Sequence, residues 1–409
     1  MLENKLVSKL GLGILKRNGL GFVKLSVRNS SAEAPAKTCL YDFHVASGGK
    51  MVDFAGYAMP VQYSSLGISA SHNHTRTNCS LFDVSHMLQT KVYGKDRFEF
   101  IESITVADVK NLKTNHGALT LFTNENGGII DDLIVTNADE HLYVVSNAGC
   151  RDKDIPLMSG REKDMKQMGK DVTLEFIEDR GLVALQGPTM MACLQPLTNI
   201  DLSKLGFMSS TVGVVAGIAG CRVTRCGYTG EDGVEISVLE KDTVTLVEAL
   251  LNSAGNPALA GLGARDSLRL EAGLCLYGND IDATTTPVEA TLAWTIPKTR
   301  RAVGGFPGSD IILKQLKEGA DRKRVGFLSS GPPARGHTSV LDADGKKVGE
   351  ITSGCPSPSI GSGTNVSMGY VDKNVSKVGT PLFLQVRNKK IETKVSKMPF
   401  VPSNYFYLK

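Results

Sequence analysis

The sequence predicts an α+β protein, and three observations support that fold class. Short β-rich runs are mixed with isolated amphipathic helical patterns, whereas a doubly wound parallel sheet would alternate strands and helices regularly. Glycine is frequent, with 43 residues in 409, and aromatic residues make up only 6% of the chain. In the C-terminal part, turn signals recur about every eight to twelve residues, which is typical of a small all-β unit.

Composition and charge narrow the class of protein further. Hydrophobic residues make up 41% and charged residues 22% of the chain, an ordinary globular composition. At roughly 150 residues per domain, the length predicts two or three domains. The formal net charge of +4 lies in the N-terminal segment, so the remainder does not favour nucleic-acid binding. No apolar run reaches about 18 residues, which predicts no transmembrane helix and no membrane association.

The N-terminal residues 1–33 have the composition of a mitochondrial targeting segment. They are basic, poor in acids and amphipathic, and a Ser-Ser-Ala sequence and Pro35 follow, which predicts import into the mitochondrial matrix. The alternative is a disordered basic tail. Folded sequence is expected to begin near Thr38. Within residues 1–30 the bases are Lys5, Lys9, Lys16, Arg17, Lys24 and Arg28, and the single acid is Glu3.

Residues 38–296 show the mixed pattern most clearly. Residues 88–100 predict a strand, a turn at Gly94 and the start of a helix, and a meander of antiparallel hairpins follows. Val244, Val247, Leu250 and Leu251 recur at helical spacing and make one apolar face. The predicted strands of the meander are 119–123, 129–136 and 142–146, and three more strands lie within 209–239. The predicted helices are 154–168, 189–197, 242–253 and 262–274.

Residues 296–323 are basic and rich in glycine and proline, which predicts a linker. The residues after it, 320–405, are expected to form a C-terminal β-barrel domain. Its predicted strands are 324–328, 339–341, 347–352, 366–371, 381–386 and 390–395.

Several common cofactor sites are missing from the sequence. No dinucleotide-binding glycine motif and no phosphate-binding loop occur, which argues against flavin and nucleotide cofactors. The eight cysteines are scattered, with no Cys-x-x-Cys pair, and are expected to be reduced. His72 and His74 are placed on one side of a predicted strand but lack ligand-type neighbours, so no metal is expected. His86 is interpreted as a packed, hydrogen-bonded histidine.

Asp131 and Asp132 interrupt an otherwise apolar run at 129–135. Neighbouring side chains of a strand point to opposite faces, so one of the two carboxylates must face the buried side. A buried carboxylate is costly unless a donor or a cation satisfies it. It is therefore either a structural hydrogen-bond acceptor or a site residue, and the spacing alone does not decide between them.

Two further residues attract attention for similar reasons. Glu235 lies between Val234 and Ile236 in a strand that follows a glycine-rich turn, and it is either a site residue or part of an ordinary solvent-facing alternation. Arg265 lies near the start of a predicted helix, where the helix dipole disfavours a cation. That position indicates a ligand or a carboxylate partner, with an ordinary surface arginine as the alternative.

The chain resembles the aminomethyltransferase family, the T-proteins of the glycine cleavage system, over about residues 38–409. The ending Met398-Pro-Phe-Val-Pro-Ser-Asn-Tyr405 is similar to that of its animal mitochondrial members. The motifs that carry the resemblance are Lys50-Met-Val-Asp-Phe-Ala-Gly56, Leu81-Phe-Asp-Val-Ser-His-Met87, Gly127-Gly-Ile-Ile-Asp-Asp132, Ala184-Leu-Gln-Gly-Pro188, Gly227-Tyr-Thr-Gly-Glu-Asp-Gly233, Gly263-Ala-Arg-Asp266, Leu270-Glu-Ala272, Gly278-Asn-Asp280 and Ile351-Thr-Ser-Gly354.

The resemblance implies a three-part, clover-like α+β fold around a central folate site, with two interleaved parts in residues 38–296 and the barrel as the third. It also implies transfer of the aminomethyl group from the lipoyl arm of H-protein to tetrahydrofolate, the co-substrate. The products are 5,10-methylenetetrahydrofolate, ammonia and dihydrolipoyl H-protein. The alternative from a different class is a non-catalytic folate-binding or scaffold protein of the same fold.

The resemblance also assigns roles to individual residues. Asp132 takes the catalytic position, with the hypothesised role of orienting a folate nitrogen and accepting its proton. The folate-contacting positions are Glu235, Arg265 and Tyr405, with Met87 and Tyr228 as additional pocket residues. Two departures concern the entry path: Ser69-Ala-Ser-His72 stands where some bacterial relatives have an acid–histidine pair, and Leu88 stands where they have glycine.

Overall fold

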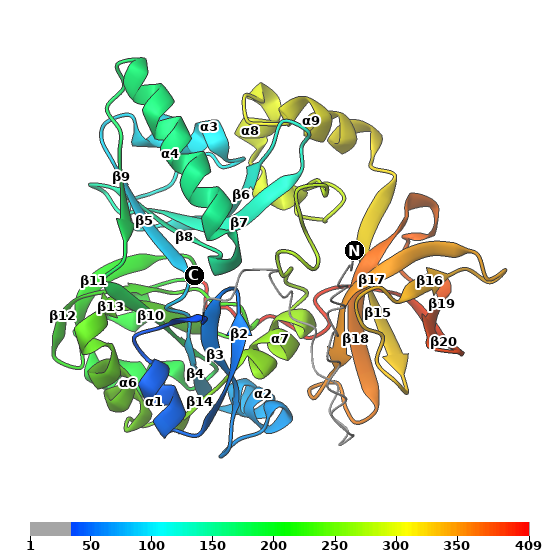
Figure 1. The fold of residues 1–409 in the computed structure, drawn as a ribbon, viewed down its shortest axis with the longest axis horizontal. Helices are drawn as coiled ribbons and strands as arrows, with labels where there is room; N and C mark the ends of the chain where they lie inside the picture. Colours follow the sequence, from blue (N-terminus) through cyan, green and yellow to red (C-terminus); the bar gives the residue numbers. More distant parts are fainter. Residues whose placement is uncertain (1–33, 409) are drawn as a thin grey trace, which may run out of the picture.

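The computed structural model describes residues 34–408, and the predicted targeting segment at residues 1–33 lies outside the described residues. Three lobes are arranged around a middle region that contains α7 (Leu262–Glu271) and the chain after it (Figure 1). Two lobes mix helices with large sheets, and the third is a closed barrel. The predicted α+β class and C-terminal β-barrel are therefore confirmed.

The first lobe is a five-stranded antiparallel sheet with two helices packed on it. Its strand order is β6-β7-β8-β5-β9, so β7 lies inside the sheet between β6 and β8. Phe100 of α3, Met158 of α4 and Leu133 of β7 are buried in one core, which fixes the helices on the sheet. The elements are β5 (Leu88–Tyr93), α3 (Arg97–Ile104), β6 (Gly117–Thr123), β7 (Ile129–Asn137), β8 (Leu142–Ser146), α4 (Arg151–Gln167) and β9 (Thr173–Ile177).

The second lobe is a six-stranded sheet of order β11-β12-β13-β10-β4-β14. Val247 and Leu250 on the predicted apolar face of α6 pack in one core with Val183 and Ile236 of the sheet. The chain contributes β4 to this sheet before it builds the first lobe, and returns afterwards. The elements are α1 (Tyr41–Ala46), β4 (Cys79–Asp83), β10 (Arg180–Gln186), α5 (Met190–Leu194), β11 (Ser210–Val215), β12 (Ile218–Thr224), β13 (Gly233–Leu239), α6 (Thr243–Leu251) and β14 (Pro257–Leu259).

The prediction that His72 and His74 lie in a strand is wrong, because both residues lie in helix α2 (Ile68–Thr77). The buried residues of α2 are Ser71, His72 and Thr75, which recur at helical spacing but are polar. A search for apolar periodicity therefore misses this helix. Helix α2 packs on α7, and α7 packs on a small sheet. That sheet consists of β1 (Ala36–Lys37), β3 (Tyr57–Tyr63) and β2 (Gly49–Phe54).

The predicted linker at residues 296–323 is instead a folded segment with two helices, α8 (Lys298–Val303) and α9 (Ser309–Glu318). One of its glycines, Gly308, allows close packing, since a Cβ there would lie 2.4 Å from the Cα of Gly127. Phe306 and Ile312 are buried in a core that this segment shares with the first lobe. Within residues 34–408, no helix is long and apolar enough to cross a membrane.

The third lobe is a barrel that closes in the order β15-β18-β17-β16-β19-β20. After β20 the chain leaves the barrel and runs back to the other lobes (Figure 1). Along this tail, the amide of Phe400 donates to the carbonyl of Glu271, and the amide of Phe207 donates to the carbonyl of Phe406. The strands are β15 (Arg322–Ser330), β16 (Ser339–Leu341), β17 (Lys347–Pro356), β18 (Thr364–Asp372), β19 (Pro381–Val386) and β20 (Lys389–Ser396).

Candidate active site

Strand β7 places its two aspartates on opposite faces of the sheet. Asp131 is 0% exposed and lies on the same face as the buried residues Ile129 and Leu133. Asp132 lies on the other face, with Ile130 and Ile134, and is partly exposed. The carboxylate that the apolar pattern forces into the interior is therefore Asp131, and Asp132 keeps an accessible surface.

A single asparagine holds both carboxylates. The Nδ2 of Asn147 donates to the Oδ1 of Asp131 at 2.9 Å and to the Oδ1 of Asp132 at 3.0 Å. The backbone amide of Asn147 donates to the Oδ2 of Asp131 at 2.9 Å. Asn147 follows β8, the strand paired with β7, and nothing in the sequence motifs singled it out. Its position next to the aspartates becomes visible only when the strand register is known.

The environment of Asp132 makes its carboxyl a proton acceptor near neutral pH. Burial and the charge of Asp131 raise the pKa of Asp132 to about 7, although the Asn147 hydrogen bond and the charge of Lys153 act in the opposite direction. Lys153 itself places its Nζ 3.5 Å from the centroid of the Tyr277 ring. A carboxyl with a pKa near the working pH can both take up and return a proton.

Arg265, Glu235 and Tyr228 form a second polar group. The Arg265 guanidinium lies over the Tyr228 ring, 4.7 Å from its centroid. Burial raises the pKa of Glu235, while the nearby Arg265 charge lowers it. Within residues 34–408 the Arg265 guanidinium forms no hydrogen bond or ion pair with protein. The residue is partly exposed. A carboxylate and a guanidinium that are not saturated by each other are available to a polar ligand.

Tyr228 connects this group with Asp132. Its hydroxyl donates a short hydrogen bond to the carbonyl of Cys275. Burial raises the pKa of Tyr228; nearby Arg269 and Arg265 lower it, and the charge of Asp132 raises it further. Tyr228 therefore contacts Arg265 through its ring and lies within electrostatic range of Asp132.

Met87 and His86 lie beside the same group. Met87 is partly buried against the core that includes Phe82 and Ala264. His86 is 3% exposed and packs edge-on against Phe54, but its Nδ1 has no hydrogen-bond partner among residues 34–408. The interpretation of His86 as packed is therefore right, whereas its Nδ1 is not hydrogen-bonded. Burial lowers the pKa of His86 to about 4, so the ring is neutral at neutral pH.

The tail after the barrel brings Tyr405 to this region. The Tyr405 ring stacks on Phe207, with centroids 4.1 Å apart and an interplanar angle of 20°. Burial raises the pKa of Tyr405 to about 12, with smaller contributions that include the nearby Cys226. Cys226 also interacts with Glu235, so Tyr405 and Glu235 both lie near this cysteine.

A cavity lies between the two large sheets and reaches Glu235. Ile134 and Val145 line it from the first lobe, and Leu182 and Cys226 line it from the second. Ile134 is two residues from Asp132 on the same face of β7. The cavity therefore joins the face that carries Asp132 to the strand that carries Glu235.

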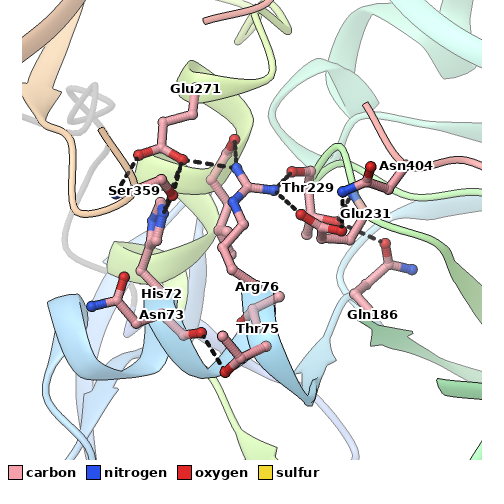
Figure 2. A network of polar contacts seen from close by, with 12 residues as sticks. His72, Asn73, Thr75, Arg76, Gln186, Thr229, Glu231, Glu271, Ser359 and Asn404 are labelled. Carbon is pink, nitrogen blue, oxygen red and sulfur yellow. Dashed lines mark hydrogen bonds and ion pairs between the residues drawn. The ribbon is translucent and has the colours of Figure 1, made fainter. Parts of the chain in front are cut away.

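A buried ionic network ties α2, α7 and the tail together (Figure 2). Arg76 donates to Glu231 at 2.8 Å and to Glu271 at 3.0 Å, and His72 lies 3.0 Å from the same Glu271. Asn404 donates to the second oxygen of Glu231 at 2.8 Å. Figure 2 shows that these side chains converge from different segments of the chain, so the network fixes the tail next to the Gly227–Gly233 loop.

These features give an α+β protein with a candidate site that contains a carboxyl of raised pKa at Asp132, a carboxylate at Glu235 that lines a small cavity, and the guanidinium of Arg265. Among residues 34–408 no cluster of three or more ligand-type side chains is placed to hold a metal ion. The family model "GCVT N-terminal domain" matches residues 40–300, and "Glycine cleavage T-protein C-terminal barrel domain" matches residues 322–402. The chain therefore belongs to the aminomethyltransferase family of glycine cleavage T-proteins.

Similar proteins agree with this assignment. Mitochondrial aminomethyltransferases of Mus musculus and Homo sapiens are each 57% identical, over 91% and 92% of this chain and 92% and 93% of their own lengths. The mitochondrial aminomethyltransferase of Flaveria pringlei is 50% identical over 97% of this chain and 98% of its own. A crystal structure of the glycine cleavage aminomethyltransferase of Bartonella henselae has a TM-score of 0.83 and 37% identity, covering 91% of this chain and 99% of that one. The chain is thus an aminomethyltransferase of the mitochondrial type.

Proposed function

We propose that this chain transfers the aminomethyl carbon from the lipoyl arm of H-protein to tetrahydrofolate. The products are 5,10-methylenetetrahydrofolate, ammonia and dihydrolipoyl H-protein. The observation that carries the proposal is the environment of Asp132: its pKa is raised to about 7, and its charge acts on Tyr228, over whose ring the Arg265 guanidinium lies. Family membership and the mitochondrial relatives support the same reaction.

The reaction needs little from the protein besides positioning and proton transfer. One folate nitrogen attacks the methylene carbon, the second folate nitrogen closes the ring, and the lipoyl sulfur and ammonia leave. The hydrogens of the two folate nitrogens end on the sulfur and in ammonia, so the equation balances. Amines are already nucleophilic, and holding the reactants in register therefore supplies much of the rate acceleration.

Asp132 takes the role of orienting the folate amine and accepting its proton. Its pKa of about 7 matches that role, because the group is neither always charged nor always protonated at neutral pH. It also places negative charge where positive charge develops on the attacking nitrogen. Asn147 keeps the carboxylate in place by its hydrogen bond of 3.0 Å.

The other site residues bind the folate. The Glu235 carboxylate pairs with two N–H groups on the edge of the pterin ring, and the Arg265 guanidinium binds a carbonyl or carboxylate oxygen of folate. Support comes from the donors of Arg265, which form no hydrogen bond or ion pair with protein within residues 34–408, and from the position of this guanidinium over the Tyr228 ring. Met87, Tyr228 and Tyr405 provide apolar and aromatic surface around the ligand.

The test is a reconstituted assay with aminomethyl-loaded H-protein, in which ammonia is measured with and without tetrahydrofolate. We expect folate-dependent release of ammonia, with an equal amount of methylenetetrahydrofolate. Binding of tetrahydrofolate without folate-dependent release would favour the alternative, a non-catalytic folate-binding or scaffold protein. Loaded H-protein incubated without the enzyme is the control for spontaneous release.

A further inference from the structure

A second pair of carboxyls lies behind Asp132. Asp131 of β7 and Asp154 of α4 are both 0% exposed. Each of the two carboxyls acts on the pKa of the other, so they lie near one another in the interior. Neither oxygen of Asp154 has a hydrogen-bond partner among residues 34–408, and the Ser146 hydroxyl, which lies close enough to lower the pKa of Asp154, is likewise unpaired. A buried carboxylate without a donor is costly, whereas two facing carboxyls remove that cost by sharing one proton.

The cations nearby do not neutralise this pair. The groups that face it are Asp132 on β7, Cys150 and Lys153 at the start of α4, and Tyr277 from the chain after α7. Lys153 is the one ammonium in the set, and it donates to the carbonyl of Ile130 and lies over the Tyr277 ring. Within residues 34–408 it forms no ion pair with any of the three aspartates. Three carboxyls beside one ammonium favour retention of a proton in the group.

The pair is joined to Asp132 through Asn147. Both oxygens of Asp131 accept hydrogen bonds from Asn147, one from the side chain and one from the backbone amide. The same side-chain nitrogen then donates to Asp132. Any change in the charge or position of Asp131 is therefore felt by Asp132 through this bridge and through the direct repulsion of the two carboxylates.

We propose that Asp131 and Asp154 share one proton from neutral pH to about two pH units above it, where Asp132 is ionised, and, through Asn147, act as positioning residues that set the geometry and the protonation of Asp132. The inference rests on the proposed function only in assigning Asp132 to the reaction. Burial and the facing carboxyl raise the pKa of Asp131, burial raises that of Asp154 to about 6, and the charge on Asp131 contributes to the raised pKa of Asp132. These directions agree with the geometry.

The shared proton is tested directly by infrared spectroscopy on the full chain labelled with [4-13C]aspartate. The spectrum is recorded roughly two pH units above the pKa of Asp132, where that carboxyl is ionised. We expect an isotope-shifted C=O band of a protonated carboxyl in the wild type and in Asp132→Asn, and no such band in Asp131→Asn or Asp154→Asn. Absence of the band from the wild type, or its loss in Asp132→Asn, would overturn the proposal. If Asp154→Asn does not fold, the wild type and Asp132→Asn still decide.

The effect on Asp132 is tested by the pH dependence of kcat/KM. Asp131→Asn removes the neighbouring charge, so the acid limb should move down by about one pH unit. Asp154→Asn confines the negative charge of the pair to Asp131, next to Asp132, so the acid limb of the kcat/KM curve should move to higher pH. Asp164→Asn, an exposed position on the same helix, is the matched control and should leave the limb in place. Lower rates with an unmoved limb in both variants would indicate a merely structural role.

The two proposals fail in different ways. An inactive wild type that still shows the carboxyl band would reject the proposed reaction and leave the proton-sharing pair standing. An active wild type without the band would reject the pair and leave the reaction standing.

Discussion

Replacing Asp132 by asparagine removes the proton-accepting carboxylate and preserves the shape of the side chain. The amide oxygen can still accept the hydrogen bond that Asn147 donates at 3.0 Å, so the local geometry of β7 and β8 should persist. The variant also removes negative charge from the neighbourhood of Tyr228 and Lys153. The substitution therefore separates the charge and proton chemistry of Asp132 from its contribution to folding.

The size of the expected effect follows from the role and the pKa. Loss of a positioned general base costs about 10² to 10⁴ in rate, so turnover should fall at least about a hundredfold. In the wild type the active form is the carboxylate, whose pKa is raised to about 7. Activity should therefore be full above that pH and fall as the pH decreases, to about a tenth of its plateau one unit below the pKa. The acid limb should vanish in Asp132→Asn.

The assay measures methylenetetrahydrofolate formation from aminomethyl-loaded H-protein across the pH range, and tetrahydrofolate binding by calorimetry. We expect binding within a few-fold of the wild type, because Glu235 and Arg265 are untouched. The exposed Asp164→Asn is the control for an Asp-to-Asn change. Near-normal turnover in Asp132→Asn, or an acid limb that survives the substitution, would refute the assignment of Asp132 as the proton acceptor.

Three more outcomes are expected. Glu235→Gln should weaken tetrahydrofolate binding about tenfold, equivalent to about 1.4 kcal/mol, because one ring N–H loses its charged acceptor; unchanged affinity in calorimetry would contradict this. Arg76→Met leaves Glu231 and Glu271 without their buried cation and should lower the free energy of unfolding by about 3 kcal/mol or more in denaturant titrations, and a loss near zero would contradict it. Hydrogen bonds and charge from His72 lower the pKa of Glu271 from 4.5 to about 2. The ionised Glu271 therefore stabilises the folded protein above pH 4.5, and this stabilisation is lost as the pH falls towards 2. Glu271→Gln should flatten that part of the stability curve, and an unchanged slope would count against this role.

Much of the fold could be predicted because the hydrophobic periodicity of a strand or helix and the residues of its turns are properties of the local sequence. The strands at residues 339–341 and 381–386 coincide with β16 and β19, where alternation and turn residues agree. Helix α2 could not be predicted in the same way, because its buried residues are polar and are satisfied by partners far along the chain, such as Glu271 for His72. The segment at 296–323 was misjudged because glycine and proline mark close packing as well as flexibility.

The residues of the candidate site also fall into two groups, those with a local sequence signal and those without one. Asp132 and Arg265 stood out because each is locally unfavourable, a carboxylate in an apolar strand and a cation near a helix start. Asn147 and Asp154 carry no such local signal, since an asparagine after a strand and an aspartate in the first turns of a helix are ordinary. Their importance comes from the register of β7 with β8 and from the packing of α4 on that sheet.

The glycine turn before Asp132 shows how local sequence and long-range packing combine at this site. A Cβ on Gly128 would lie 1.8 Å from the carbonyl oxygen of Ala283, and one on Gly308 would lie 2.4 Å from Gly127. Two distant segments can therefore press against this turn only because it lacks side chains. The amide of Ile129, the first residue of β7, donates to the carbonyls of Asp282 and Thr285, so the start of the strand is fixed from outside its sheet. Because Asp132 lies only three residues further on, the packing of the 282–308 chain determines where its carboxylate stands.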